Sequence, residues 1–174
     1  MLFIQHELQR TAQNLVADNI KNDEHVLIVS SSDQSKELID AIVSAASSTS
    51  AASVSAIIIA CPEDLKDYKH PAPVIASVKS ADLTIVATTL RFPRAYDDLS
   101  EALFKAGKRQ VLINNAPLED FTRGASLADP IELNRRTHAL AGKISEGKIV
   151  RVKSENGTDL SVKVCRPCIA SVSY

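Results

Sequence analysis

Two polar segments of the sequence carry the residue types that could contact a ligand. Residues 30–35, SSSDQS, follow an apolar run, and their hydroxyls and the Asp33 carboxylate could present oxygen atoms to a bound molecule. Ser and Asp also cap helices at such places, so capping and ligand contact are both open. Residues 88–94, TTLRFPR, combine threonines with arginines, whose guanidinium groups bind carboxylates through two parallel hydrogen bonds. We predict ligand contacts from Asp33, Thr88 and Arg91, with solvated loop arginines as the alternative to the last.

The histidines are scattered and form no metal-binding motif. Neither H-x-H nor H-E-x-x-H occurs, although a mononuclear Fe(II) site needs two imidazoles and a carboxylate on one side of the metal. Distant residues would have to converge in space to build one. We therefore predict no metal ligand in this chain, and we predict that the acidic pairs lie on solvated faces. The histidines are His6, His25, His70 and His138, and the acidic pairs are Asp97-Asp98 and Glu119-Asp120.

The cysteines give a weak signal for chemistry. Cys165 and Cys168 have the C-x-x-C spacing of redox sites and half-zinc sites, but they end a predicted strand instead of opening a helix. A second C-x-x-C, which a zinc site would need, does not occur. Cys61 ends an apolar run, and we predict that it is buried. The sequence thus assigns no catalytic residue.

Glycine usage excludes one class of ligand site. The first glycine is Gly107, so the first predicted strand cannot open into G-x-G-x-x-G or a P-loop, where only glycine lets the backbone approach phosphate closely. A phosphate-binding loop of either kind is therefore not expected.

The elements that would position these residues alternate between strands and helices. The apolar runs are continuous, which is typical of parallel strands with both faces covered. We therefore predict an α/β fold with an open, mostly parallel, Rossmann-like sheet flanked by helices. The expected strands span residues 26–29, 54–60, 83–87 and 111–113, and the expected helices span residues 4–20, 36–47, 73–80 and 95–106.

A last helix and a β-hairpin follow. Asp129, Pro130 and Glu132 predict an N-cap, a first helical residue and a capping box, and Gly147 predicts the helix end. Residues 148–164 alternate around Asn156-Gly157, with a three-residue loop that ends at Gly157 and places Val152 opposite Leu160. We expect a domain over residues 1–147 and the incomplete start of a second over 148–174.

Composition narrows the classes of binding partner. The net charge of −1 lacks the excess of positive charge that is typical of proteins that bind nucleic acid or an anionic membrane. The residues after Met1 lack the apolar run of a signal peptide, and no run approaches transmembrane length. A cytoplasmic protein is expected, without nucleic acid or membrane partners.

The hairpin also carries a family resemblance. Its Gly157-Thr158-Asp159-Leu160 turn, with preceding segments, resembles the 2,5-dihydroxypyridine 5,6-dioxygenase-like enzymes, which are related to metalloaminopeptidases of the leucyl aminopeptidase and aminopeptidase T type. The resemblance runs from about Asn22 to Val164. The preceding segments are Phe121-Thr122-Arg123-Gly124, Ala128-Asp129 and residues 133–140, LNRRTHAL.

This resemblance implies an N-terminal domain without catalysis of its own. In the full-length family, Fe(II) or another divalent metal is bound in the C-terminal half of a longer chain, so no cofactor is expected here. The implied partner is a second copy or a complementary C-terminal chain. Two alternatives stay open: a fragment of a leucyl aminopeptidase-type metallopeptidase, and a non-catalytic α/β module for binding or assembly.

Overall fold

The chain divides into two compact units, Met1–Leu127 and Ala128–Tyr174. The computed structural model describes residues 2–61, 68–89, 97–114 and 117–169. The division places the last helix in the second unit, whereas the sequence suggests a boundary after it, at Gly147; that boundary stays a prediction.

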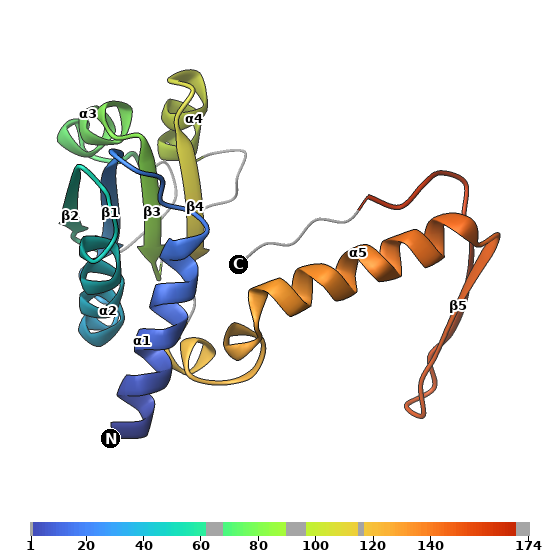
Figure 1. The fold of residues 1–174 in the computed structure, drawn as a ribbon. Coiled ribbons are helices and arrows are strands. Elements are labelled where there is room, and N and C mark those ends of the chain that lie inside the picture. Colours follow the sequence, from blue (N-terminus) through green and yellow to red (C-terminus); the bar gives the residue numbers. More distant parts are fainter. Residues whose placement is uncertain (1, 62–67, 90–96, 115–116, 170–174) are drawn as a thin grey trace. The chain divides into compact units, whose positions relative to one another are not determined.

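The first unit contains a parallel sheet of four strands in the order β2-β1-β3-β4 (Figure 1). This confirms the predicted α/β class. The central strands β1 and β3 are buried almost throughout, because helices cover both faces of the sheet. The strands are β1 (His25–Ser31), β2 (Ser53–Ile59), β3 (Leu83–Thr88) and β4 (Arg109–Asn114).

Alternate residues of β1 and β3 face two separate cores. Val26 and Ile28 point to the core shared with α1 and α2, whereas Leu27 and Val29 point to the core shared with α3 and α4. This separation accounts for the continuous apolar runs in the sequence. The helices are α1 (Leu2–Ala17), α2 (Lys36–Ser47), α3 (Ala72–Ser80) and α4 (Asp98–Lys105).

Local signals placed most of these elements correctly. The bounds of α2 agree with the prediction, and Ser35 is its N-cap, accepting a hydrogen bond from the Leu38 N–H. Helix α1 ends at Ala17, earlier than the predicted residue 20, because the Asn19 side chain donates to Leu15 O over 2.7 Å and closes the last turn. Helix α4 begins after its N-cap Asp97.

The loop after β4 forms short 3-10 helices and contributes to the first core. They are η2 (Leu118–Phe121) and η3 (Gly124–Leu127). Phe121 is buried against the α1 and α2 side of the sheet. The backbone of η3 is tied to α1, since Thr11 and Arg10 donate to carbonyl oxygens within it.

The second unit consists of α5 (Pro130–Glu146) and the hairpin β5 (Ile149–Lys153) and β6 (Asp159–Lys163). Asp129 caps α5 as predicted, accepting from the N–H groups of Ile131 and Glu132. The Glu132 carboxylate, however, pairs with arginines of the next turn and not, as a capping box would require, with the Asp129 N–H.

The hairpin has the predicted register. Val152 pairs with Leu160, and Gly157 has a φ of +94°, which a residue with a side chain rarely adopts. Cys165 and Cys168 after the hairpin are free and exposed. None of the described helices combines the length and apolar character needed to span a membrane.

Candidate functional site

The carboxyl ends of β1 and β3 meet at the point where the chain changes direction across the sheet. From β1 the chain passes to β2 on one side, and from β3 to β4 on the other. In open α/β sheets, ligands bind in the crevice outside such a switch point. Any polar side chain in the loops after these two strands is therefore a candidate for ligand contact.

Asp33 and Thr89 join these two loops. The Thr89 hydroxyl donates to Asp33 Oδ2 over 2.6 Å, and the Thr89 N–H donates to the Ser31 hydroxyl over 3.1 Å. The Ser31 hydroxyl also lies 3.2 Å from Thr89 Oγ1. Ser31 is buried, Thr89 is half-buried and Asp33 is exposed, so the cluster has a fixed base and one carboxylate that faces water. We call Ser31, Asp33 and Thr89 the switch-point cluster.

The carboxylate of this cluster is held in its ionised form. Hydrogen bonds from the Thr89 hydroxyl, and next from Ser31, lower the pKa of Asp33 below its ordinary value. At neutral pH Asp33 therefore acts as a hydrogen-bond acceptor and a negative charge. A ligand that offers O–H or N–H groups, or a positive charge, is the chemical match.

Cys61 approaches the cluster from the loop after β2. Its N–H donates to the Ser32 hydroxyl over 3.1 Å. The sequence prediction of a buried Cys61 is wrong, because β2 ends at Ile59 and leaves the cysteine beyond the strand, where it is exposed. Partial desolvation of the sulfur, and then the Asp33 carboxylate, raise the pKa of the Cys61 thiol. The protonated thiol is therefore a weak donor, not a nucleophile, at neutral pH.

The three sequence-predicted contact residues have different positions. Asp33 is exposed at the switch point. Thr88 is buried at the end of β3, with 2% of its surface exposed, and it is the next residue, Thr89, whose hydroxyl reaches Asp33. Arg91 lies outside the described residues. Ser31 belongs to the polar segment 30–35 that the sequence analysis singled out, but it was not among the predicted contact residues; its hydrogen-bond contacts with Thr89 show its part in the cluster.

A second polar group lies at the start of α4. His70 is buried, and its Nδ1 lies 2.6 Å from Asp98 Oδ1. The His70 N–H also donates to Asp98 Oδ2, over 3.1 Å, so one carboxylate joins the loop before α3 to the first turn of α4. The prediction that Asp97 and Asp98 lie on a solvated face is therefore wrong. Asp97 caps α4 and accepts from the Leu99 N–H.

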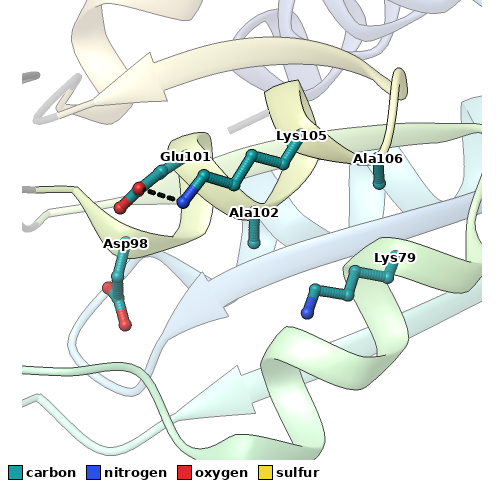
Figure 2. A pocket seen from close by; sticks show the side chains of 6 residues that line it. All are labelled: Lys79, Asp98, Glu101, Ala102, Lys105 and Ala106. Carbon is teal, nitrogen blue, oxygen red and sulfur yellow. Dashed lines mark hydrogen bonds and ion pairs between the residues drawn. The ribbon is translucent and has the colours of Figure 1, made fainter.

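A groove lies between α3 and α4 and has a volume of about 390 Å³ (Figure 2). Lys79 comes from α3, and the other lining residues come from α4 and its C-cap. Glu101 and Lys105 pair across one helical turn at 2.5 Å. Asp98 is held by His70. Most of the charge in the groove is thus already paired, and the groove is a weaker candidate than the switch-point cluster.

Comparison with known proteins places this fold in a family. The model of the 2,5-dihydroxypyridine 5,6-dioxygenase family matches residues 7–174. The chain belongs to this family. A comparison with curated protein sequences finds no match.

A solved structure supports the fold of this dioxygenase-family chain. The structure of 2,5-dihydroxypyridine dioxygenase from Pseudomonas putida KT2440 matches with a TM-score of 0.60 and 16% sequence identity. The match covers 92% of this chain and 48% of the other chain. The chain thus spans about half the length of that dioxygenase.

The dioxygenase family raises the question of a metal site. Within the described ranges, His70, Asp97 and Asp98 are the one group of three or more potential ligands, with donor atoms within 4.8 Å of one another. The group offers one imidazole, not the two that a facial Fe(II) site requires. Its donor atoms already bond one another and the first turn of α4. These residues therefore do not fit a site for Fe(II).

Proposed function

We propose that the first unit is a ligand-binding domain of a 2,5-dihydroxypyridine dioxygenase-like protein, without catalysis of its own. The observation that carries this proposal is the Thr89–Asp33 hydrogen bond at the switch point of the sheet. It fixes an ionised carboxylate where open α/β sheets bind ligands. Family membership suggests the class of ligand, a hydroxylated nitrogen heterocycle.

The chemistry of the cluster suits such a ring. The Asp33 carboxylate accepts hydrogen bonds from ring hydroxyl or N–H groups, and the half-buried Thr89 limits its movement. A hydrogen bond to a charged group is stronger than one between neutral groups, so this single acceptor can orient a small ring. The Cys61 thiol beside it adds an apolar, weakly donating wall.

We propose the absence of catalysis because neither group of polar residues offers the side chains that a catalytic iron needs. Ring cleavage in this family is expected to need Fe(II) or another divalent metal, and the group at His70 does not match that requirement. The switch-point cluster offers one carboxylate and two hydroxyls, which are poor ligands for a resident iron. The domain would bind and orient the ring, and other residues of the family fold would hold the metal.

Binding is tested by titrating the chain with 2,5-dihydroxypyridine in a calorimeter. The Asp33→Asn variant is expected to bind at least about tenfold more weakly, because a charged acceptor is lost. Asp40→Asn is the matched control, since Asp40 is an exposed carboxylate on α2 that pairs with Lys36. Equal affinity in all three proteins would exclude the switch-point cluster as the binding site.

Catalysis is tested separately by following the ultraviolet absorbance of 2,5-dihydroxypyridine in air with added Fe(II). The chain is expected to leave the absorbance unchanged. Turnover above the rate with free Fe(II) would overturn the non-catalytic assignment and leave the binding result standing. Kinship with the aminopeptidase T type metallopeptidases and a cytoplasmic location stay predictions from the sequence.

A further inference from the structure

The hairpin of the second unit exposes an apolar face and two strand edges. Val152, Leu160 and Val162 are each about half exposed, at 47%, 51% and 49%. The two-stranded sheet contains only β5 and β6, so no described strand pairs with either outer edge. Unpaired edges of this kind are templates for a further strand, and an isolated two-stranded hairpin is only marginally stable.

The backbone pattern shows which groups face outward. Val164 donates to Lys148 O, and Ser154 donates to Thr158 O. In an antiparallel ladder, hydrogen-bonded pairs alternate with non-hydrogen-bonded pairs, so the Arg151–Ser161 pair is of the second kind. The N–H and C=O of Ser161 therefore point away from β5, toward the free edge of β6.

The free edge of β6 is complementary to itself. In an antiparallel pair of two β6 strands centred on Ser161, Asp159 of one copy lies opposite Lys163 of the other, and Leu160 lies opposite Val162. Both ends of the pair thus carry opposite charges, and the apolar residues continue across it. Among the described residues, Lys163 has no ion-pair partner within its own chain. Asp159 pairs with Arg151 and Lys153 of the neighbouring strand, and its side chain stays 52% exposed, so it can also face the lysine of a second copy.

The free edge of β5 lacks this property. The same construction centred on Arg151 places two arginines opposite each other and Ile149 opposite Lys153. Like charges directly opposite one another destabilise a strand pair. The β5 edge therefore opposes self-pairing, whereas the β6 edge favours it.

We propose that β6 is a homodimerisation edge: two copies of this chain pair antiparallel through β6, about a two-fold axis at Ser161, and form a four-stranded sheet. The pairing continues one apolar face over both hairpins and satisfies the outward N–H and C=O groups of Ser161. The strand is short, and the contact falls in the class of small, weak interfaces. The dimer is therefore expected to depend on protein concentration.

A proline at the centre of β6 tests the pairing. Ser161→Pro removes the N–H that would bond the second copy and leaves the hydrogen bonds inside the hairpin intact. Arg151→Pro makes the same backbone change on the opposite edge, and it also removes the ion pair between Arg151 and Asp159. In sedimentation equilibrium, the wild type and Arg151→Pro are expected to dimerise with rising concentration, and Ser161→Pro is expected to stay monomeric. Far-ultraviolet circular dichroism checks that each variant folds.

Charge exchange tests the register. Lys163→Glu places like charges opposite Asp159, and Asp159→Lys places them opposite Lys163, so each variant alone is expected to dimerise about tenfold more weakly. An equimolar mixture restores opposite charges at both ends and is expected to recover the association as a heterodimer. The charge variants also distinguish strand pairing from a dimer that forms through the apolar faces alone. Such a dimer would have the same affinity in the wild type and in the charge variants.

Hydrogen exchange provides a local readout. The Ser161 amide is expected to become protected as the wild-type concentration rises, and the Arg151 amide is not. A wild type that stays monomeric up to millimolar concentration would overturn the proposal. So would a dimer that Ser161→Pro and the charge variants leave unchanged, which would indicate another surface or another occupant of the edge.

Discussion

The hydroxyl of Thr89 donates a hydrogen bond to the carboxylate of Asp33 over 2.6 Å, and this bond joins the loops that follow β3 and β1. The two residues are 56 positions apart in the sequence. Parallel strands bring them together, because strands that neighbour each other in a parallel sheet end at the same edge. The bond sets both the position and the charge of the exposed carboxylate.

Replacing Thr89 by valine should raise the pKa of Asp33, because the first of the bonds that lower it is lost. A carboxyl whose pKa is lowered by folding stabilises the fold above its unfolded pKa, and this contribution is lost as the pH falls through the folded pKa. The stability difference between wild type and Thr89→Val should therefore shrink below about pH 4. NMR of the Asp33 carboxyl carbon measures the midpoint of its titration. Ser77→Ala, on the surface of α3, should leave it unchanged.

Replacing His70 by alanine should destabilise the first unit by roughly 1–3 kcal/mol, since Asp98 would lose the bond from a buried imidazole. Urea unfolding gives the free energy of unfolding. His138→Ala is the control, because His138 is exposed on α5, and its effect should stay within about 0.5 kcal/mol. Equal effects at both positions would mean that the His70–Asp98 contact does not join the α3 and α4 segments.

The carboxyl of Glu132 should titrate with a midpoint far below that of an ordinary glutamate. Hydrogen bonds from Arg135 and then Arg136 lower the pKa of Glu132 to about 2. Any contribution to the stability of α5 should be complete above pH 4.5 and be lost as the pH falls toward 2. NMR titration should show the midpoint rise in Arg135→Ala, and also in high salt, which screens exposed charges. An unchanged midpoint in both cases would exclude this pairing in solution.

Two glycine-to-alanine changes in the second unit should have opposite signs. Gly157 has a φ of +94°, so Gly157→Ala should destabilise the hairpin by about 1 kcal/mol or more. Gly142 lies within α5, and a Cβ added there would meet no neighbouring side chain within 4 Å, so Gly142→Ala should stabilise the helix by roughly 0.5–1 kcal/mol. The melting temperatures of the two variants and of the wild type, from thermal unfolding, measure these changes in stability. A stabilising Gly157→Ala would contradict the turn conformation.

Local sequence signals were sufficient for much of the fold. Continuous apolar runs predicted the buried parallel strands, because a strand that is covered on both faces favours apolar side chains at successive positions. Asp129 and Gly157 fixed a helix start and a turn, since capping and a positive φ depend on near neighbours in the chain. The end of α1 was misplaced, because the side-chain bond from Asn19 to Leu15 outweighed the apolar pattern that continues to residue 20.

The sequence by itself thus determined the α/β class and the hairpin register, because both depend on the period or the chemistry of adjacent residues. Only the tertiary structure decided which residues meet. It chose Thr89 as the partner of Asp33, exposed Cys61, and placed buried His70 against Asp98. These contacts depend on strand order and on where each loop leaves the sheet, and neither is recorded in the local spacing of residues.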